Sequence, residues 1–176
     1  MIEPLFVVPI FKYQCKDWNF KKKKILSKIE RKGLRRSLLQ TFNSNRGSND
    51  SLFRSCFVET FAEELKEFTI ELGVNNITVT DVWSVRYDQD DYQGPHNHRS
   101  YSYSGILYAE YDTKVHQPTI FVGPWNDPIN DTTQLSIPQN IQEGTIIFFP
   151  SVLLHYAPQN KSHKKRTIIS FDLIIN

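Results

Sequence analysis

The sequence of 176 residues has only two cysteines, Cys15 and Cys56, and neither has a C-x-x-C partner or a neighbouring histidine. This scarcity excludes a disulfide scaffold and a zinc knuckle, and it predicts reduced thiols. No run of about 18 apolar residues occurs, so no membrane span is expected. The apolar segment Met1 to Phe11 carries Glu3 and ends at Lys12, which is not typical of a signal peptide. We therefore expect a soluble protein of the cytoplasm.

An excess of charge is also lacking, because 21 basic residues face 19 acidic ones and the formal net charge is +2. Nothing in this balance calls for a nucleic-acid or membrane partner. The basic segment from Lys21 to Arg36 is the local exception, and we expect a solvated helix face there rather than an anionic docking patch. With 39% hydrophobic and 13% aromatic residues, the chain can close one core, so a single domain over residues 1–176 is expected.

The N-terminal part, residues 1–73, is predicted to hold one strand and supporting helices. Leu5 to Phe11 is rich in β-branched and aromatic residues and is typical of an edge strand. The apolar positions then recur at helical spacing, first from Phe20 to Leu38 and again from Leu52 to Leu72. Gly73 is placed to end the second helix. We expect these helices to pack against a sheet and to have no role in cofactor binding.

The remaining residues, 74–176, form a series of predicted strands separated by turn clusters. No helical segment alternates with these strands, which excludes a parallel α/β sheet. The pattern therefore predicts a mainly β protein in which helices pack outside an antiparallel barrel or sandwich. The strands are expected at Ile77 to Tyr87, Tyr103 to Tyr111, Thr119 to Val122, Thr145 to Phe149, Leu153 to Ala157 and Thr167 to Ile175.

Histidine is rare, with five residues in all, yet His96 and His98 stand two positions apart. On an extended strand such side chains project from one face, about 6 to 7 Å apart, which suits two ligands of one metal ion. His155 ends an apolar run further downstream and could converge with them at the open end of a barrel. The alternatives are loop histidines and a satisfied core histidine. His116 and His163 lie in polar segments and are expected to be exposed.

Arg166 begins an apolar strand, where a guanidinium is costly to bury unless an anion accepts its hydrogen bonds. That anion could belong to a ligand. It could also belong to the protein, because Asp172 and Glu110 lie on candidate neighbouring strands.

The order of these motifs resembles the non-haem iron(II) and 2-oxoglutarate-dependent oxygenase superfamily. Within it, the resemblance is greatest to the small prolyl-hydroxylase-like group of bacteria and their phages, and it covers roughly Trp83 to Phe171. It implies a double-stranded β-helix, a jelly-roll or cupin-like barrel flanked by helices, in the cytoplasm of a bacterial cell or a phage-infected host. The residues that carry the resemblance are His96-Asn97-His98, Ser104-Gly105-Ile106-Leu107-Tyr108, Gly144, Phe149-Pro150-Ser151, His155, Arg166 and Ser170-Phe171.

The resemblance further implies that His96, His98 and His155 bind iron(II). In most of the superfamily the second ligand is an aspartate or glutamate. A histidine there leaves the double charge of iron(II) uncompensated by the protein, which favours an anionic co-ligand. The alternative is that one of the two neighbouring histidines does not bind the metal and that Glu110 or Asp112 supplies a carboxylate.

For the co-substrate, the resemblance assigns Arg166 to the distal carboxylate of 2-oxoglutarate. A serine often stands two positions after this arginine, but here the residue is Ile168. Thr167 or a tyrosine is therefore expected to help hold 2-oxoglutarate, and Tyr103 is favoured over Tyr108.

The activity implied is that of an Fe(II)- and 2-oxoglutarate-dependent dioxygenase, in the form of a hydroxylase that couples decarboxylation of 2-oxoglutarate to oxidation of a C-H bond by O2. One alternative is a three-histidine cupin-like metalloenzyme that does not use 2-oxoglutarate. Another is a non-catalytic binding barrel. The substrate would be selected by loops such as Asn126 to Gln142, which is a candidate lid.

Overall fold

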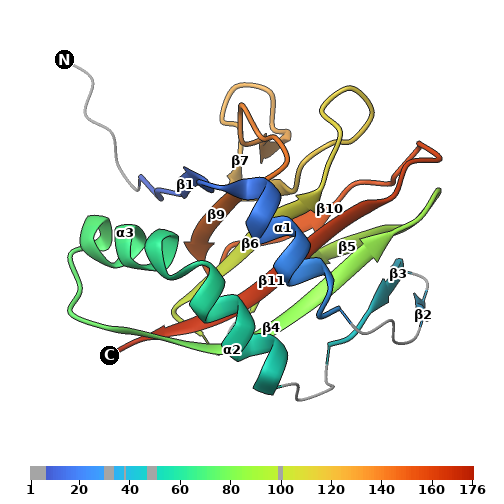
Figure 1. Ribbon diagram of the computed structural model, residues 1–176. Helices are drawn as coiled ribbons and strands as arrows, with labels where there is room; N and C mark the ends of the chain where they lie inside the picture. Colours follow the sequence, from blue (N-terminus) through green and yellow to red (C-terminus); the bar gives the residue numbers. More distant parts are fainter. Residues whose placement is uncertain (1–6, 30–33, 38, 47–50, 99–100) are drawn as a thin grey trace.

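The computed structural model consists mainly of β-strands and describes residues 7–29, 34–37, 39–46, 51–98 and 101–176 (Figure 1). The three helices of this part are α1 (Trp18–Leu26), α2 (Ser51–Thr60) and α3 (Ala62–Leu72). The strands are β1 (Phe11–Gln14), β2 (Leu34–Ser37), β3 (Gln40–Ser44), β4 (Ile77–Tyr87), β5 (Tyr92–His96), β6 (Tyr103–Glu110), β7 (Ile120–Asn126), β8 (Thr133–Ser136), β9 (Thr145–Pro150), β10 (His155–Ala157) and β11 (Arg166–Ile175). Across these described ranges, no helix is long and apolar enough to cross a bilayer.

The strands form one curled sheet in the order β1-β9-β6-β11-β4-β3-β5-β10-β7-β8, with β2 paired to β3. Every strand pair described is antiparallel. Strand β3 joins the wall made by β9, β6, β11 and β4 to the wall made by β5, β10 and β7. The helices lie along one side of this sheet (Figure 1). A mainly β chain with helices outside an antiparallel sheet confirms the predicted fold class.

Alternation along β6 and β11 divides the core into two clusters, because successive side chains of a strand point to opposite faces. On the helix side, Phe171 packs 4.9 Å from Phe57 and Phe148 stacks 4.3 Å from Phe68, measured between ring centroids. The other cluster lies inside the curl of the sheet. Its members include Trp83, Tyr87, Ile106, Tyr108, Phe149 and Ile168.

The N-terminal region differs from its prediction. Helix α1 ends at Leu26, and the expected helical continuation is wrong for residues 34–37, which form β2 and pair with β3 in an antiparallel hairpin; residues 30–33 and Leu38 lie outside the described part. Strand β3 pairs with β2, with β4 through Ser44 and with β5 through Gln40, so pairing in the sheet outweighs the helical spacing that the sequence shows at β2. The helix predicted from Leu52 to Leu72 is two helices, α2 and α3.

Some boundaries and strands also differ. The expected strand at Leu5 to Phe11 begins only at Phe11, although β1 does lie at an edge of the sheet. Residues 1–6 lie outside the described part. Strands β5 and β8 were not predicted, because their sequences contain turn-forming or polar residues. Gly73 ends α3 as predicted, in the left-handed conformation with φ of 73°.

The basic residues of α1 are largely matched by acidic side chains of the neighbouring elements. Lys21 is only 8% exposed, and its Nζ donates to the carboxylate of Glu64 at 2.8 Å. Lys22 pairs with Glu143, also at 2.8 Å. The expected solvated face is therefore wrong for Lys21, whose charge is buried and paired.

Candidate metal centre

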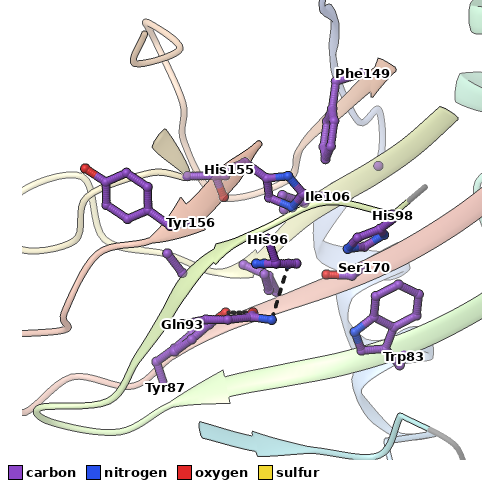
Figure 2. Close-up of a pocket in the computed structure, with 14 residues that line it drawn as sticks. Trp83, Tyr87, Gln93, His96, His98, Ile106, Phe149, His155, Tyr156 and Ser170 are labelled. Carbon is purple, nitrogen blue, oxygen red and sulfur yellow. Dashed lines mark hydrogen bonds between the residues drawn. The ribbon is translucent and has the colours of Figure 1, made fainter. Parts of the chain in front are cut away.

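The strand pairing brings the two parts of the predicted histidine motif together. His96 ends β5 and lies directly opposite His155, the first residue of β10. His98 follows two residues later, and its backbone N-H donates to the carbonyl of Ser151 at 2.8 Å. The ring centroid of His96 lies 4.4 Å from that of His155, and the centroid of His98 lies 5.3 Å from each of the other two. One nitrogen from each ring lies within 4.8 Å of the others. Figure 2 shows the three rings gathered at one place beside the cavity.

Two of the histidines are fixed by backbone carbonyls. His96 Nδ1 lies 2.9 Å from the carbonyl oxygen of Gly94, and His155 Nδ1 lies 2.9 Å from that of Leu153. A carbonyl oxygen only accepts hydrogen bonds, so each Nδ1 carries the proton of the neutral ring. Each Nε2 therefore presents a lone pair.

His98 is fixed by a carboxylate instead. Its Nδ1 lies 2.6 Å from Asp172 Oδ1, and Asp172 is fully buried. Ser104 Oγ donates to the same carboxylate oxygen at 2.6 Å and contacts Ser151 Oγ at 2.9 Å. His98 Nε2 is buried and has no hydrogen-bond partner among the described residues. From the sequence, Asp172 was expected only as an ion-pair partner of Arg166. The two residues lie six positions apart on β11, so their side chains point to the same face of the strand. That even spacing is the signal that could have placed Asp172 on the face of the site.

The electrostatics favour neutral rings. Burial lowers the pKa of His155 to about 3, and the neighbouring His96 adds to that effect. Burial also lowers the pKa of His96. Three converging imidazoles, with the Nε2 of His98 buried and without a partner among the described residues, suit a divalent transition metal. The residues present therefore fit a metal ion. The Nδ1 atom of each ring is hydrogen-bonded to a carbonyl or carboxylate oxygen, as is usual for a histidine that binds a metal through its other nitrogen.

A small cavity lies beside the histidines, and its volume is about 20 Å³. That is room for about one water molecule. Gln93 limits it, because its Nε2 donates to His96 Nε2 at 3.3 Å while its Oε1 accepts from Tyr87 Oη at 3.0 Å (Figure 2). The cavity is also lined by His155, Phe149, Ile106, Ile168, Ser170, Thr119, Tyr156 and Trp83.

Arg166 begins β11 on the strand face that lines the cavity and is 2% exposed. Its two terminal nitrogens donate to the carbonyl oxygens of Gln117 and Pro158 at 2.8 and 2.7 Å, and its guanidinium lies 4.3 Å from the ring centroid of Tyr87. Within the described part of the chain no carboxylate pairs with it. The alternative of an ion pair with Asp172 or Glu110 is therefore wrong.

The structure does not bring the two predicted companions of Arg166 to the cavity. Tyr103 lies on the helix side of the sheet, with its ring centroid 5.2 Å from that of Phe68. Thr167 Oγ1 donates to Glu110. Tyr108, which the sequence disfavoured, belongs to the inner cluster. Successive side chains of a strand point to opposite faces, so Tyr103 on β6 and Thr167 on β11 both point away from the cavity.

The alternative carboxylate ligands are occupied elsewhere. Glu110 accepts from Thr167, and Asp112 pairs with Lys164. His116, expected to be exposed, is 7% exposed, and its ring bridges the backbone N-H of Asp112 and the carbonyl of Lys164, each at 3.0 Å. These residues stabilise a loop. Of the described histidine, cysteine and acidic residues, only His96, His98 and His155 form a metal-compatible group.

A family model described as "Putative 2OG-Fe(II) oxygenase" matches residues 81–172. No curated protein matches the sequence. Among solved structures, a prolyl-4-hydroxylase from Pseudomonas putida is 9% identical, with a TM-score of 0.60 over 96% of this chain and 94% of that one. HygX from Streptomyces hygroscopicus, solved with nickel and 2-oxoglutarate bound, is 9% identical, with a TM-score of 0.61 over 96% of this chain and 84% of that one.

A non-heme alpha-ketoglutarate-dependent epimerase from nogalamycin biosynthesis is also similar, with 11% identity and a TM-score of 0.67 over 96% of this chain and 79% of that one. At these identities the likeness is one of fold. It confirms the predicted double-stranded β-helix.

Proposed function

The chain belongs to the family of 2OG-Fe(II) oxygenases, and on this premise we propose that it is a hydroxylase whose iron(II) is bound by His96, His98 and His155. The observation that carries the ligand set is the arrangement of the rings, in which every Nδ1 is bonded to an oxygen acceptor and the metal would take the Nε2 lone pairs, that of His96 in place of its bond to Gln93. When bound, iron(II) and 2-oxoglutarate supply activation of O2, with release of succinate and CO2.

The protein's own contribution at the metal is geometry. The facing positions of His96 and His155 on paired strands fix the spacing of two rings before any ligand arrives. The backbone bond from His98 to Ser151 holds the third. Side chains that are already oriented lose little freedom on binding, which favours both affinity and a defined open face for the co-substrates.

We propose Arg166 as the anchor of the distal carboxylate of 2-oxoglutarate. Its guanidinium is buried and uses two of its N-H donors on carbonyl oxygens, which leaves further donors for an anion. Ile168 and Ser170, on the same strand face, line the space between Arg166 and His98. A buried cation with neutral partners gains strongly from a carboxylate.

Entry of 2-oxoglutarate requires Gln93 to move. The cavity of about 20 Å³ is far too small for a dicarboxylate, and the Gln93 side chain stands between His96 and Tyr87. Its hydrogen bond to His96 Nε2 also occupies the lone pair that the metal needs. Rotation of this one side chain frees the metal ligand and opens the path towards Arg166.

Hydroxylation is the reaction type that we propose within the family. The prolyl-4-hydroxylase from Pseudomonas putida, which shares the fold over nearly its whole length, supports it. The alpha-ketoglutarate-dependent epimerase from nogalamycin biosynthesis represents the competing outcome, which is epimerisation.

The test is turnover of 2-oxoglutarate by the iron(II)-loaded protein over a panel of substrates, under labelled ¹⁸O2. We expect succinate formation that needs iron(II) and O2, with one ¹⁸O atom in the product. His155→Ala should abolish iron binding and succinate release, whereas His163→Ala, a change at an exposed histidine, should alter neither. Succinate release without label in the product would contradict hydroxylation.

A further inference from the structure

We propose that Asp172 supplies the carboxylate charge of this metal centre, acting through His98 rather than on the metal itself. The inference rests on the proposed ligand set and assigns a positioning role to a residue outside it. It explains how a histidine can stand at the position where a carboxylate is usual in the superfamily.

The contact between the two residues is short and buried. Asp172 Oδ1 lies 2.6 Å from His98 Nδ1, and the exposed fractions of the two side chains are 0% and 5%. Ser104 donates to the same oxygen, and Ser151 bonds Ser104 in turn. Because both side chains are buried, the interaction between them is little screened by water.

The three histidines are not equivalent in this respect. His96 and His155 donate their outer N-H to neutral backbone carbonyls of Gly94 and Leu153. His98 donates to an anion. A carboxylate behind an imidazole raises its basicity towards a metal on the other nitrogen. The one ring with this partner is therefore the ring that occupies the carboxylate position.

Asp172 reaches the centre only through the ring. It meets His98 at Nδ1, while Nε2, on the other side of the imidazole, has no hydrogen-bond partner among the described residues and is left for the metal. Its second oxygen faces Arg46, whose terminal nitrogen lies 3.7 Å away. Arg46 is partly exposed and stacks 4.1 Å from the ring centroid of Trp83, so it offsets the buried charge only in part.

The test is Co(II) binding to the metal-free protein, measured by calorimetry for wild type and Asp172→Asn. The asparagine oxygen still accepts from His98 Nδ1, so the ring stays oriented and only the charge is lost. We expect the Co(II) dissociation constant to rise roughly 10- to 100-fold. Glu110→Gln, which removes a carboxylate bonded on the opposite face of the same sheet, should leave it unchanged.

A spectroscopic measurement separates charge from packing. In the anaerobic iron(II) and 2-oxoglutarate complex, Asp172→Asn should shift the charge-transfer band to shorter wavelength, because the iron becomes less electron-rich. A folded Asp172→Asn protein with wild-type Co(II) affinity and an unshifted band would overturn the inference.

Two further measurements keep the outcomes distinct. His98→Ala with wild-type Co(II) affinity would overturn the ligand set, whereas loss of affinity in His98→Ala but not in Asp172→Asn overturns only the role of Asp172. If Asp172→Asn does not fold, the Zn(II)-loaded wild type decides by proton NMR. We expect the Nδ1 proton of His98 downfield of those of His96 and His155, and coincident signals would contradict the inference.

Discussion

At the scale of single residues, Arg166 is the side chain proposed to bind the distal carboxylate of 2-oxoglutarate. Loss of one charge-assisted bond costs about 1.5 to 3 kcal/mol, so Arg166→Ala should raise the 2-oxoglutarate dissociation constant roughly 10- to 150-fold. The measurement is anaerobic titration of the iron(II)-loaded variant. Arg54→Ala is the matched control, because Arg54 also donates to a backbone carbonyl, that of Thr80, but from helix α2. Equal constants for Arg166→Ala and wild type would remove Arg166 from the site.

Gln93 competes with the metal for His96, which gives a second prediction for a single residue. Its amide bonds the His96 nitrogen that the metal needs, so Gln93→Ala should strengthen Co(II) binding. A net hydrogen bond of about 1 kcal/mol corresponds to roughly fivefold in the dissociation constant, measurable by calorimetry. Gln139→Ala, at an exposed glutamine, is the control. Weaker Co(II) binding in Gln93→Ala would show that Gln93 supports the site rather than competes for it.

The residues of the site were predictable to different degrees. The histidines and Arg166 have side chains whose chemistry limits their use, so sequence alone assigned them. Asp172 was missed as a partner of His98, because the bond joins residues 74 positions apart in the sequence. Tyr103 was favoured over Tyr108, although only pairing shows which strand face looks inward.

At the scale of secondary-structure elements, β6 and β11 pack closely where Gly105 faces the ring of Phe171. A Cβ atom on Gly105 would lie 2.0 Å from Phe171 Cζ, inside the packed helix-side cluster. Gly105→Ala should therefore lower the free energy of unfolding by about 1 to 3 kcal/mol, as measured by urea denaturation. The double variant Gly105→Ala with Phe171→Leu should recover part of the loss. Strictly additive losses would contradict the steric explanation.

Long strands with β-branched residues were predicted well, and β4 matches its predicted bounds. Strand β5 was missed because Tyr92–His96 contains glycine and proline, and it exists through pairing with β3 and β10. Strand β2 was predicted as helix, and β3 was not predicted as a strand, although the two pair with each other in the sheet. Such elements are fixed by partners distant in the sequence, which local spacing does not record.

At the scale of the whole molecule, the buried His116 predicts a dependence of stability on pH. Burial lowers its pKa in the folded protein, so below the ordinary value of about 6.5 the unfolded chain binds the proton more readily. The free energy of unfolding should then fall as the pH drops from about 6.5 towards the folded pKa, by at most about 1.4 kcal/mol per pH unit for this one group.

The check compares urea unfolding of wild type and His116→Asn across this range, since other buried histidines contribute equally to both. The stability difference between the two proteins should shrink on acidification. Parallel pH curves would contradict the assigned pKa direction.

The central claim, that His96, His98 and His155 hold an iron(II) ion to which 2-oxoglutarate binds, is tested most directly by one titration. Adding 2-oxoglutarate anaerobically to the iron(II)-loaded protein should produce a visible charge-transfer band that saturates at one equivalent per chain. Failure of the band to appear in protein that holds a full equivalent of iron would contradict the claim.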